Sequence, residues 1–163
     1  VLMYNVPSRT GVNLLPETVA RLVREVPDIV GIKEACGDLS QIVKLMTLTD
    51  GKIDLYSGND DQTVPIMAMG GLGVISVVAN VAPKKMHDLC AAFQAGDLAA
   101  ARALQLETEE LFECLFSEVN PIPVKKAVNL MGFAAGPLRL PLTEMTPAKA
   151  EKMAEAMKKL GVL

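Results

Sequence analysis

Short apolar runs rich in β-branched residues alternate with longer amphipathic segments along the first half of this 163-residue chain. The runs that predict strands are residues 1–6, 29–35, 53–57 and 73–79, and the segments that predict helices between them are 16–26, 39–48 and 61–69. This alternation is typical of βα units, because each helix carries the chain back to start the next strand in parallel. We therefore expect four parallel strands joined by right-handed crossovers.

The strand pattern stops after the fourth run, while helical spacing continues to the end of the sequence. The further predicted helices are residues 83–95, 97–116, 121–131 and 147–160. We place a boundary near Gly96, which gives a βα region at residues 1–95 and a helical region at residues 96–163.

Four βα units fit either an open sheet or part of a closed barrel. A nucleotide-binding sheet would carry a glycine-rich phosphate loop, and neither GxGxxG nor GxxxxGK[ST] occurs. The predicted strands instead end in polar or reactive residues, namely Tyr4, Lys33, Ser57 with Gly58, and Asn80. A (β/α)₈ barrel places reactive groups at the carboxyl ends of its strands and needs roughly 250 residues. The expected fold class is therefore α/β, with half of a barrel present.

Composition narrows the classes of function. The net charge is -3 and the basic residues are scattered, so no nucleic-acid surface is predicted. No apolar run approaches the ~18 residues of a membrane span, and no charged leader precedes the first strand, so we expect a cytoplasmic protein. Cys36, Cys90 and Cys114 lie far apart without a nearby histidine, which predicts reduced thiols and no metal site.

Lys33 is the residue whose position most suggests catalysis. Side chains alternate along a strand, so Lys33 shares a face with Gly31, while Val30 and Ile32 face the helices. A lysine inside a barrel is partly desolvated, and lowering its pKa from about 10.4 to near 7 costs roughly 4 to 5 kcal/mol. The neutral amine is a nucleophile that forms imines with carbonyl carbons. The alternative is a lysine whose ammonium extends to solvent without a chemical role.

Tyr4 and Arg9 are the candidates to act with Lys33. Tyr4 ends the preceding strand, so its phenol is within reach of the same substrate carbon and can act as a general acid and base. Arg9 follows in a loop, where a guanidinium binds a carboxylate. The alternatives are a core tyrosine and a solvated loop arginine. Glu34 has the opposite orientation to Lys33, and we expect it to form an outward ion pair.

Five segments resemble a known family: YNVPSRTG, GIKEACGDL, LYSGNDD, GGLGVISVVANV and NPIPVKKA. In order and spacing they resemble the C-terminal half of dihydrodipicolinate synthases, which belong with N-acetylneuraminate lyase to the pyruvate-dependent class I aldolases. The resemblance covers essentially the whole chain. It implies the fifth to eighth strands of a (β/α)₈ TIM barrel, a helical C-terminal region and a homotetramer.

The resemblance also implies roles for individual residues. Lys33 would form a Schiff base with pyruvate, Tyr4 would relay protons, and Arg9 would hold the carboxylate of aspartate semialdehyde. Gly58 and the backbone of Ile75 would line the pyruvate site. The product would be 4-hydroxy-tetrahydrodipicolinate, in the diaminopimelate route of lysine biosynthesis. No metal or organic cofactor is implied.

Two alternative functions stay open. Lyases that act on sugar acids share the YN-P and GIKE stretches but generally lack an arginine at the place of Arg9, so the SRT run favours the synthase. The second alternative is a catalytically incomplete half-barrel with a structural role. The family's N-terminal half carries a Thr-Thr-Gly segment that binds pyruvate, and we expect this chain to need that half or another copy as its partner.

Overall fold

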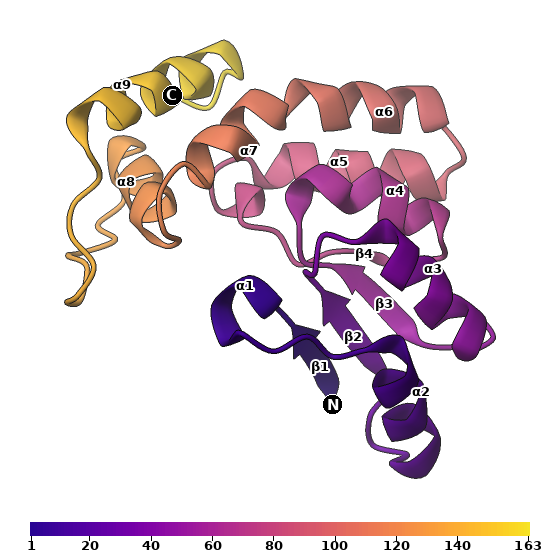
Figure 1. Cartoon of the computed structure of the whole chain (residues 1–163). Coiled ribbons are helices and arrows are strands. Elements are labelled where there is room, and N and C mark those ends of the chain that lie inside the picture. The colour runs from indigo at the N-terminus through magenta and orange to yellow at the C-terminus, as the bar shows by residue number, and fades with distance from the viewer. The chain divides into compact units, whose positions relative to one another are not determined.

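Four parallel strands form one sheet in the order β1-β2-β3-β4 (Figure 1). In the computed structural model, which describes residues 1–163, the chain divides into two compact units, Val1–Ser76 and Val77–Leu163. The elements of the first unit are β1 (Leu2–Asn5), α1 (Pro7–Thr10), α2 (Pro16–Glu25), β2 (Gly31–Glu34), α3 (Leu39–Leu48), β3 (Asp54–Ser57), the 3₁₀ turn η1 (Asp60–Gln62), α4 (Thr63–Ala68) and β4 (Gly73–Val74). The predicted parallel βα arrangement is confirmed.

The core of the first unit lies between the sheet and its helices. Its fully buried residues are Val19, Ile32, Ile42, Leu45, Ile53, Leu55 and Ile66. They come from one face of β2 and β3 and from the inner faces of α2, α3 and α4, as the alternation of apolar residues predicts. The opposite face of the sheet carries Tyr4 and Lys33.

Local capping residues fix where two of the helices begin. Asp38 precedes α3, and its Oδ1 accepts hydrogen bonds from the amides of Ser40 at 2.8 Å and Gln41 at 3.2 Å. Pro16 occupies the first turn of α2, where its missing N–H has no cost. Both helices begin where the sequence analysis expects them, at residues 16 and 39.

The second unit is helical. It contains the 3₁₀ turn η2 (Val78–Asn80), α5 (Pro83–Gln94), α6 (Leu98–Glu107), α7 (Glu109–Leu115), α8 (Ile122–Leu130) and α9 (Pro147–Lys159). The boundary that we predicted near Gly96 falls inside this unit, between α5 and α6, which pack against each other. No helix in the structure is both long and apolar enough to cross a bilayer.

Two predicted elements differ from the structure. The strand expected at 73–79 is shorter and ends as β4 at Val74. The amide of Ile75 still donates to the Ser57 carbonyl of β3 at 2.9 Å, and Ser76 Oγ then donates to Asp60 Oδ1 of η1. The single helix expected at 97–116 is interrupted at Thr108, a buried residue. Its Oγ1 donates to the carbonyls of Leu104 at 3.0 Å and Gln105 at 3.1 Å, a side-chain bond that competes with the regular helix pattern.

Candidate active site

Tyr4 and Lys33 face each other across the ends of two neighbouring strands. The register of β1 and β2 places Tyr4 directly opposite Lys33, at the height that the sequence predicts. Lys33 Nζ lies over the Tyr4 ring, 4.2 Å from its centroid. In the next strand, Tyr56 is the register partner of Lys33. The two predicted reactive side chains are therefore in contact.

The Lys33 amine has no anionic partner in the structure. The side chain is partly buried, and its Nζ makes neither a hydrogen bond nor an ion pair with the protein. Lys33 Nζ contacts the face of the Tyr4 ring. In its neutral form, an amine without an ion pair can attack a carbonyl carbon, and a phenol beside it can exchange protons with the product.

Gly58 packs close to the Lys33 stem. Its N–H donates to the carbonyl of Glu34 at 2.7 Å, which brings the end of β3 against the end of β2. A Cβ at this position would lie 3.1 Å from Lys33 Cε and 2.6 Å from Ala35 Cβ. The absence of a side chain at Gly58 thus leaves room for the lysine.

Ile75 and Arg9 each lie beyond the carboxyl end of a strand. Ile75 continues β4, and its N–H donates to the carbonyl of Ser57 at 2.9 Å. Arg9 lies on α1, the short helix that directly follows β1 (Figure 1), where the sequence analysis predicted a loop. Its side chain is exposed and forms no ion pair, so its guanidinium is available to an anionic ligand.

The prediction that Glu34 forms an outward ion pair is wrong. Glu34 is only 1% exposed, and its carboxylate accepts from Asn5 Nδ2 at 2.9 and 3.2 Å and from the amide of Cys36 at 2.9 Å. Asn5, also 1% exposed, escaped the sequence analysis. Both residues directly follow the reactive pair in their strands, and this shared position was the available signal.

Two aspartates follow β3 and were likewise missed. Asp60 is buried and accepts from Ser76 Oγ. Asp61 Oδ1 is buried without a hydrogen-bond partner, and burial, together with the neighbouring Asp60 charge, raises the pKa of the Asp61 carboxyl. No group of three or more His, Cys, Asp or Glu side chains is arranged to hold a metal ion.

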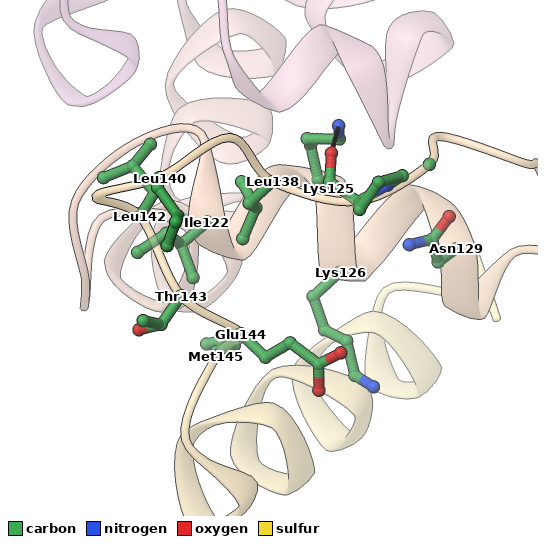
Figure 2. Close-up of a pocket in the computed structure, with 12 residues that line it drawn as sticks. Ile122, Lys125, Lys126, Asn129, Leu138, Leu140, Leu142, Thr143, Glu144 and Met145 are labelled. Atoms are coloured by element: carbon green, nitrogen blue, oxygen red, sulfur yellow. Dashed lines mark hydrogen bonds between the residues drawn. The ribbon is translucent and has the colours of Figure 1, made fainter.

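A pocket of about 430 Å³ lies in the second unit, between α8 and the loop that precedes α9 (Figure 2). Its walls are mainly apolar side chains such as Ile122 and Leu142. Of its polar groups, Lys125 Nζ donates to the carbonyl of Pro137 at 2.7 Å. The pocket contains none of the residues that the sequence predicts for catalysis.

Comparison with known proteins identifies relatives over the whole chain. A model of the dihydrodipicolinate synthetase family matches residues 1–160. A 4-hydroxy-tetrahydrodipicolinate synthase of Lachnoclostridium phytofermentans is 55% identical over 163 residues, which are 100% of this chain and 55% of that protein. The chain thus spans about half the length of the curated relatives it matches.

Solved structures agree with the sequence comparison. The dihydrodipicolinate synthase of Thermotoga maritima is 47% identical and superimposes with a TM-score of 0.96, covering 99% of this chain and 56% of that one. A monomeric dihydrodipicolinate synthase variant is 45% identical, with a TM-score of 0.94 over 99% of this chain and 55% of its own. The α/β arrangement of a parallel sheet with helices is therefore the one found in these proteins.

Proposed function

Because the chain belongs to the dihydrodipicolinate synthetase family, we propose that it carries the Schiff-base lysine and proton-relay tyrosine of a synthase that condenses pyruvate with aspartate semialdehyde. The product is 4-hydroxy-tetrahydrodipicolinate, an intermediate of lysine biosynthesis through diaminopimelate. The observation that carries the proposal is the unpaired Lys33 Nζ, which lies 4.2 Å from the centroid of the Tyr4 ring.

In this proposal Lys33 and Tyr4 divide the chemistry of the first half-reaction. Lys33 Nζ attacks the ketone carbon of pyruvate, and the resulting carbinolamine loses water to give a protonated imine. Loss of a proton from the pyruvate methyl group then gives an enamine, whose carbon attacks the aldehyde of the second substrate. The Tyr4 hydroxyl moves protons in these steps, since the ring that carries it lies against the reacting nitrogen.

The remaining residues bind rather than react. The Arg9 guanidinium, exposed and without an ion pair, holds the carboxylate of aspartate semialdehyde. Gly58 and the backbone of Ile75 line the space that pyruvate occupies. Gly58 follows β3, the strand next to that of Lys33, and Ile75 follows β4, the strand after it. No cofactor takes part.

We propose further that β1 to β4 are the fifth to eighth strands of a (β/α)₈ barrel. The length shared with relatives supports this assignment, since the chain spans 55% of a curated relative. The other strands would complete the pyruvate site, and a homotetramer in the cytoplasm is the expected assembly and location. One structural relative is a monomeric variant, so assembly differs among these proteins.

Borohydride trapping tests the proposal directly. The chain is incubated with pyruvate and sodium borohydride, which reduces the imine to a stable secondary amine, and the modified residue is located by mass spectrometry. We expect one reduced pyruvyl group on Lys33 and none in the Lys33→Ala variant. Lys44, an exposed lysine of the same unit, is the internal control. An intact chain that remains unmodified would support the incomplete half-barrel instead.

A second assay separates the synthase from a sugar-acid lyase. Pyruvate consumption is measured with aspartate semialdehyde, and pyruvate release is measured from N-acetylneuraminate. We expect activity with the former, because Arg9 offers a site for the carboxylate of the semialdehyde. A clear preference for the sugar acid would reject the synthase and leave the Schiff-base chemistry in place.

A further inference from the structure

A buried side-chain pair lies directly behind the reactive pair. Asn5 follows Tyr4 in β1, Glu34 follows Lys33 in β2, and the two are register partners. Because side chains alternate along a strand, Asn5 and Glu34 point to the face opposite that of Tyr4 and Lys33. Both are 1% exposed, which is unusual for a carboxylate without a cationic partner.

The hydrogen bonds of this pair connect the two strand ends. Asn5 Nδ2 donates to Glu34 Oε1 at 2.9 Å and Oε2 at 3.2 Å. Glu34 Oε1 also accepts from the amide of Cys36 at 2.9 Å, which lies just beyond the end of β2. The backbone adds one more link, since the amide of Ala35 donates to the carbonyl of Asn5 at 2.9 Å.

Asn5 is itself held by the segment that leads to α2. Its Oδ1 accepts from the amide of Leu14 at 3.0 Å, and its Nδ2 donates to Asn13 Oδ1 at 2.9 Å. Asn13 exchanges hydrogen bonds with Gln41 on α3, at 2.8 and 3.2 Å. Both the oxygen and the nitrogen of the Asn5 amide are thus hydrogen-bonded, which fixes the orientation of the side chain.

We propose that Asn5 and Glu34 are positioning residues, which fix the distance and angle between the Tyr4 ring and Lys33 Nζ. In its catalytic part this inference rests on the proposed function. A carboxylate suits the position because it accepts from both Asn5 and Cys36 and presents no hydrogen of its own to them. Burying the Glu34 carboxylate costs free energy, which its hydrogen bonds to Asn5 and Cys36 offset. Those bonds hold the ends of β1 and β2 together beside the reactive residues.

The geometric part can be tested without turnover. Aromatic ring current shifts the NMR signals of the Lys33 ε-methylene group, because Nζ lies over the Tyr4 ring. The Glu34→Leu variant removes the acceptor, so we expect this ring-current shift to fall by more than half. Glu34→Asp keeps the charge but shortens the side chain, and it is expected to lose part of the shift should the leucine variant fail to fold.

The catalytic part is tested by the rate of pyruvate adduct formation at Lys33. We expect Glu34→Leu to slow it by about 10- to 100-fold, as a displacement of about 1 Å does for a positioned nucleophile. Glu34→Gln keeps Oε1 as acceptor for Asn5 and Cys36 but turns an N–H group toward Asn5 Nδ2, so we expect its rate to lie between those of the parent chain and the leucine variant.

The control is Ile42→Ala, which removes a fully buried side chain from the core of the same unit. We expect it to lower thermal stability without changing the ring-current shift or the adduct rate of the folded chain. Glu34 variants that behave like Ile42→Ala in all three measurements would show that the pair only stabilises the fold. If the parent chain forms no adduct, the proposed function fails, while the ring-current comparison still decides whether the pair positions Lys33.

Discussion

Gly58 packs so closely against Ala35, Glu34 and Lys33 that a methyl group at this position is not accommodated without a shift of its neighbours. A Cβ there would lie 2.6 Å from Ala35 Cβ, 3.0 Å from the Glu34 carbonyl and 3.1 Å from Lys33 Cε. We expect Gly58→Ala to destabilise the chain by about 1–3 kcal/mol, the usual cost of overpacking, and to slow trapping of pyruvate on Lys33. Urea unfolding and borohydride trapping measure the two effects.

The double variant Gly58→Ala with Ala35→Gly separates the two effects. Removing Ala35 Cβ relieves the shortest contact but leaves those to Glu34 and Lys33. Stability is therefore expected to recover in part while trapping stays slow. Full recovery of both quantities would mean that Gly58 matters for packing against Ala35 and not for the lysine.

Arg9 is expected to act on the second substrate only. Its exposed side chain lies on α1, after the end of β1, and forms no ion pair in the structure. We expect Arg9→Ala to leave the pyruvate adduct unchanged and to weaken condensation by about 10- to 100-fold, the loss of a charge-assisted hydrogen bond of roughly 1.5–3 kcal/mol. Loss of the adduct in this variant would contradict the separate roles of Arg9 and Lys33.

Cys36 lies just beyond the strand of Lys33, yet its environment makes it unreactive. Burial raises the pKa of the thiol to about 11, and the neighbouring Glu34 charge adds to the effect. At pH 8 we therefore expect alkylation by iodoacetamide to be on the order of 100-fold slower than for free cysteine. Peptide-resolved mass spectrometry measures the rate, with the urea-unfolded chain as control. A rate that levels off below about pH 9 would be inconsistent with the raised pKa.

Glu118 binds Thr146, the residue that immediately precedes helix α9. The Glu118 carboxylate accepts from Thr146 Oγ1 at 2.7 Å and from the Thr146 amide at 3.2 Å. These bonds, with Lys149 nearby, lower the pKa of Glu118. A carboxyl whose folded pKa is lowered contributes stability above its unfolded pKa of ~4.3, and this contribution is lost as the pH falls through the folded pKa.

The lowered pKa of Glu118 can be tested by the pH dependence of stability, with a matched control. At neutral pH we expect Glu118→Gln to unfold at a lower urea concentration than the parent chain, and the difference to vanish as the pH falls below about 4. Glu151→Gln, which changes an exposed carboxylate on α9 that has no recorded partner, is expected to match the parent chain throughout. A Glu118 difference that persists in acid would point to a packing effect.

Secondary structure could be predicted where local pattern decides it. The apolar alternation identified β1, β2 and β3, and helical spacing identified α2 and α3. The early end of β4 and the break at Thr108 could not be predicted in this way. Ser76 and Thr108, at these two points, form side-chain hydrogen bonds whose partners become known only once the chain is folded.

The site shows the same limit. Parity and strand order placed Tyr4 opposite Lys33, because neighbouring parallel strands bring their ends together. The alternation of side chains also placed Glu34 correctly on the opposite face, but it did not predict which groups Glu34 binds. A charged side chain on the helix side of a strand is expected to reach solvent, whereas Glu34 is buried by its bonds to Asn5 and Cys36. Which partner satisfies a buried charge is a tertiary property.

At the scale of the whole molecule, the first unit has a sheet covered by helices on one face only. The other face exposes Leu2, Tyr4 and Ile75 beside the partly buried Lys33. β1 and β4 each have a single neighbouring strand, so the sheet has two open edges. Open edges beside an apolar face favour pairing with another chain.

We therefore expect this chain to associate as its concentration rises, and the association to depend on the β1 edge. Replacing Leu2 by lysine puts a charge on that edge and removes one apolar side chain from the interface. Losing the burial of one leucine, about 1.5–3 kcal/mol, is expected to weaken association by roughly 10- to 100-fold. Sedimentation velocity over a range of concentrations measures the change.

Leu140→Lys, at a site 88% exposed in the second unit, is the matched control and is expected to have no effect. A parent chain that stays monomeric at all concentrations would contradict this prediction. Equal effects of Leu2→Lys and Leu140→Lys would show that the open sheet is not the surface through which this chain associates.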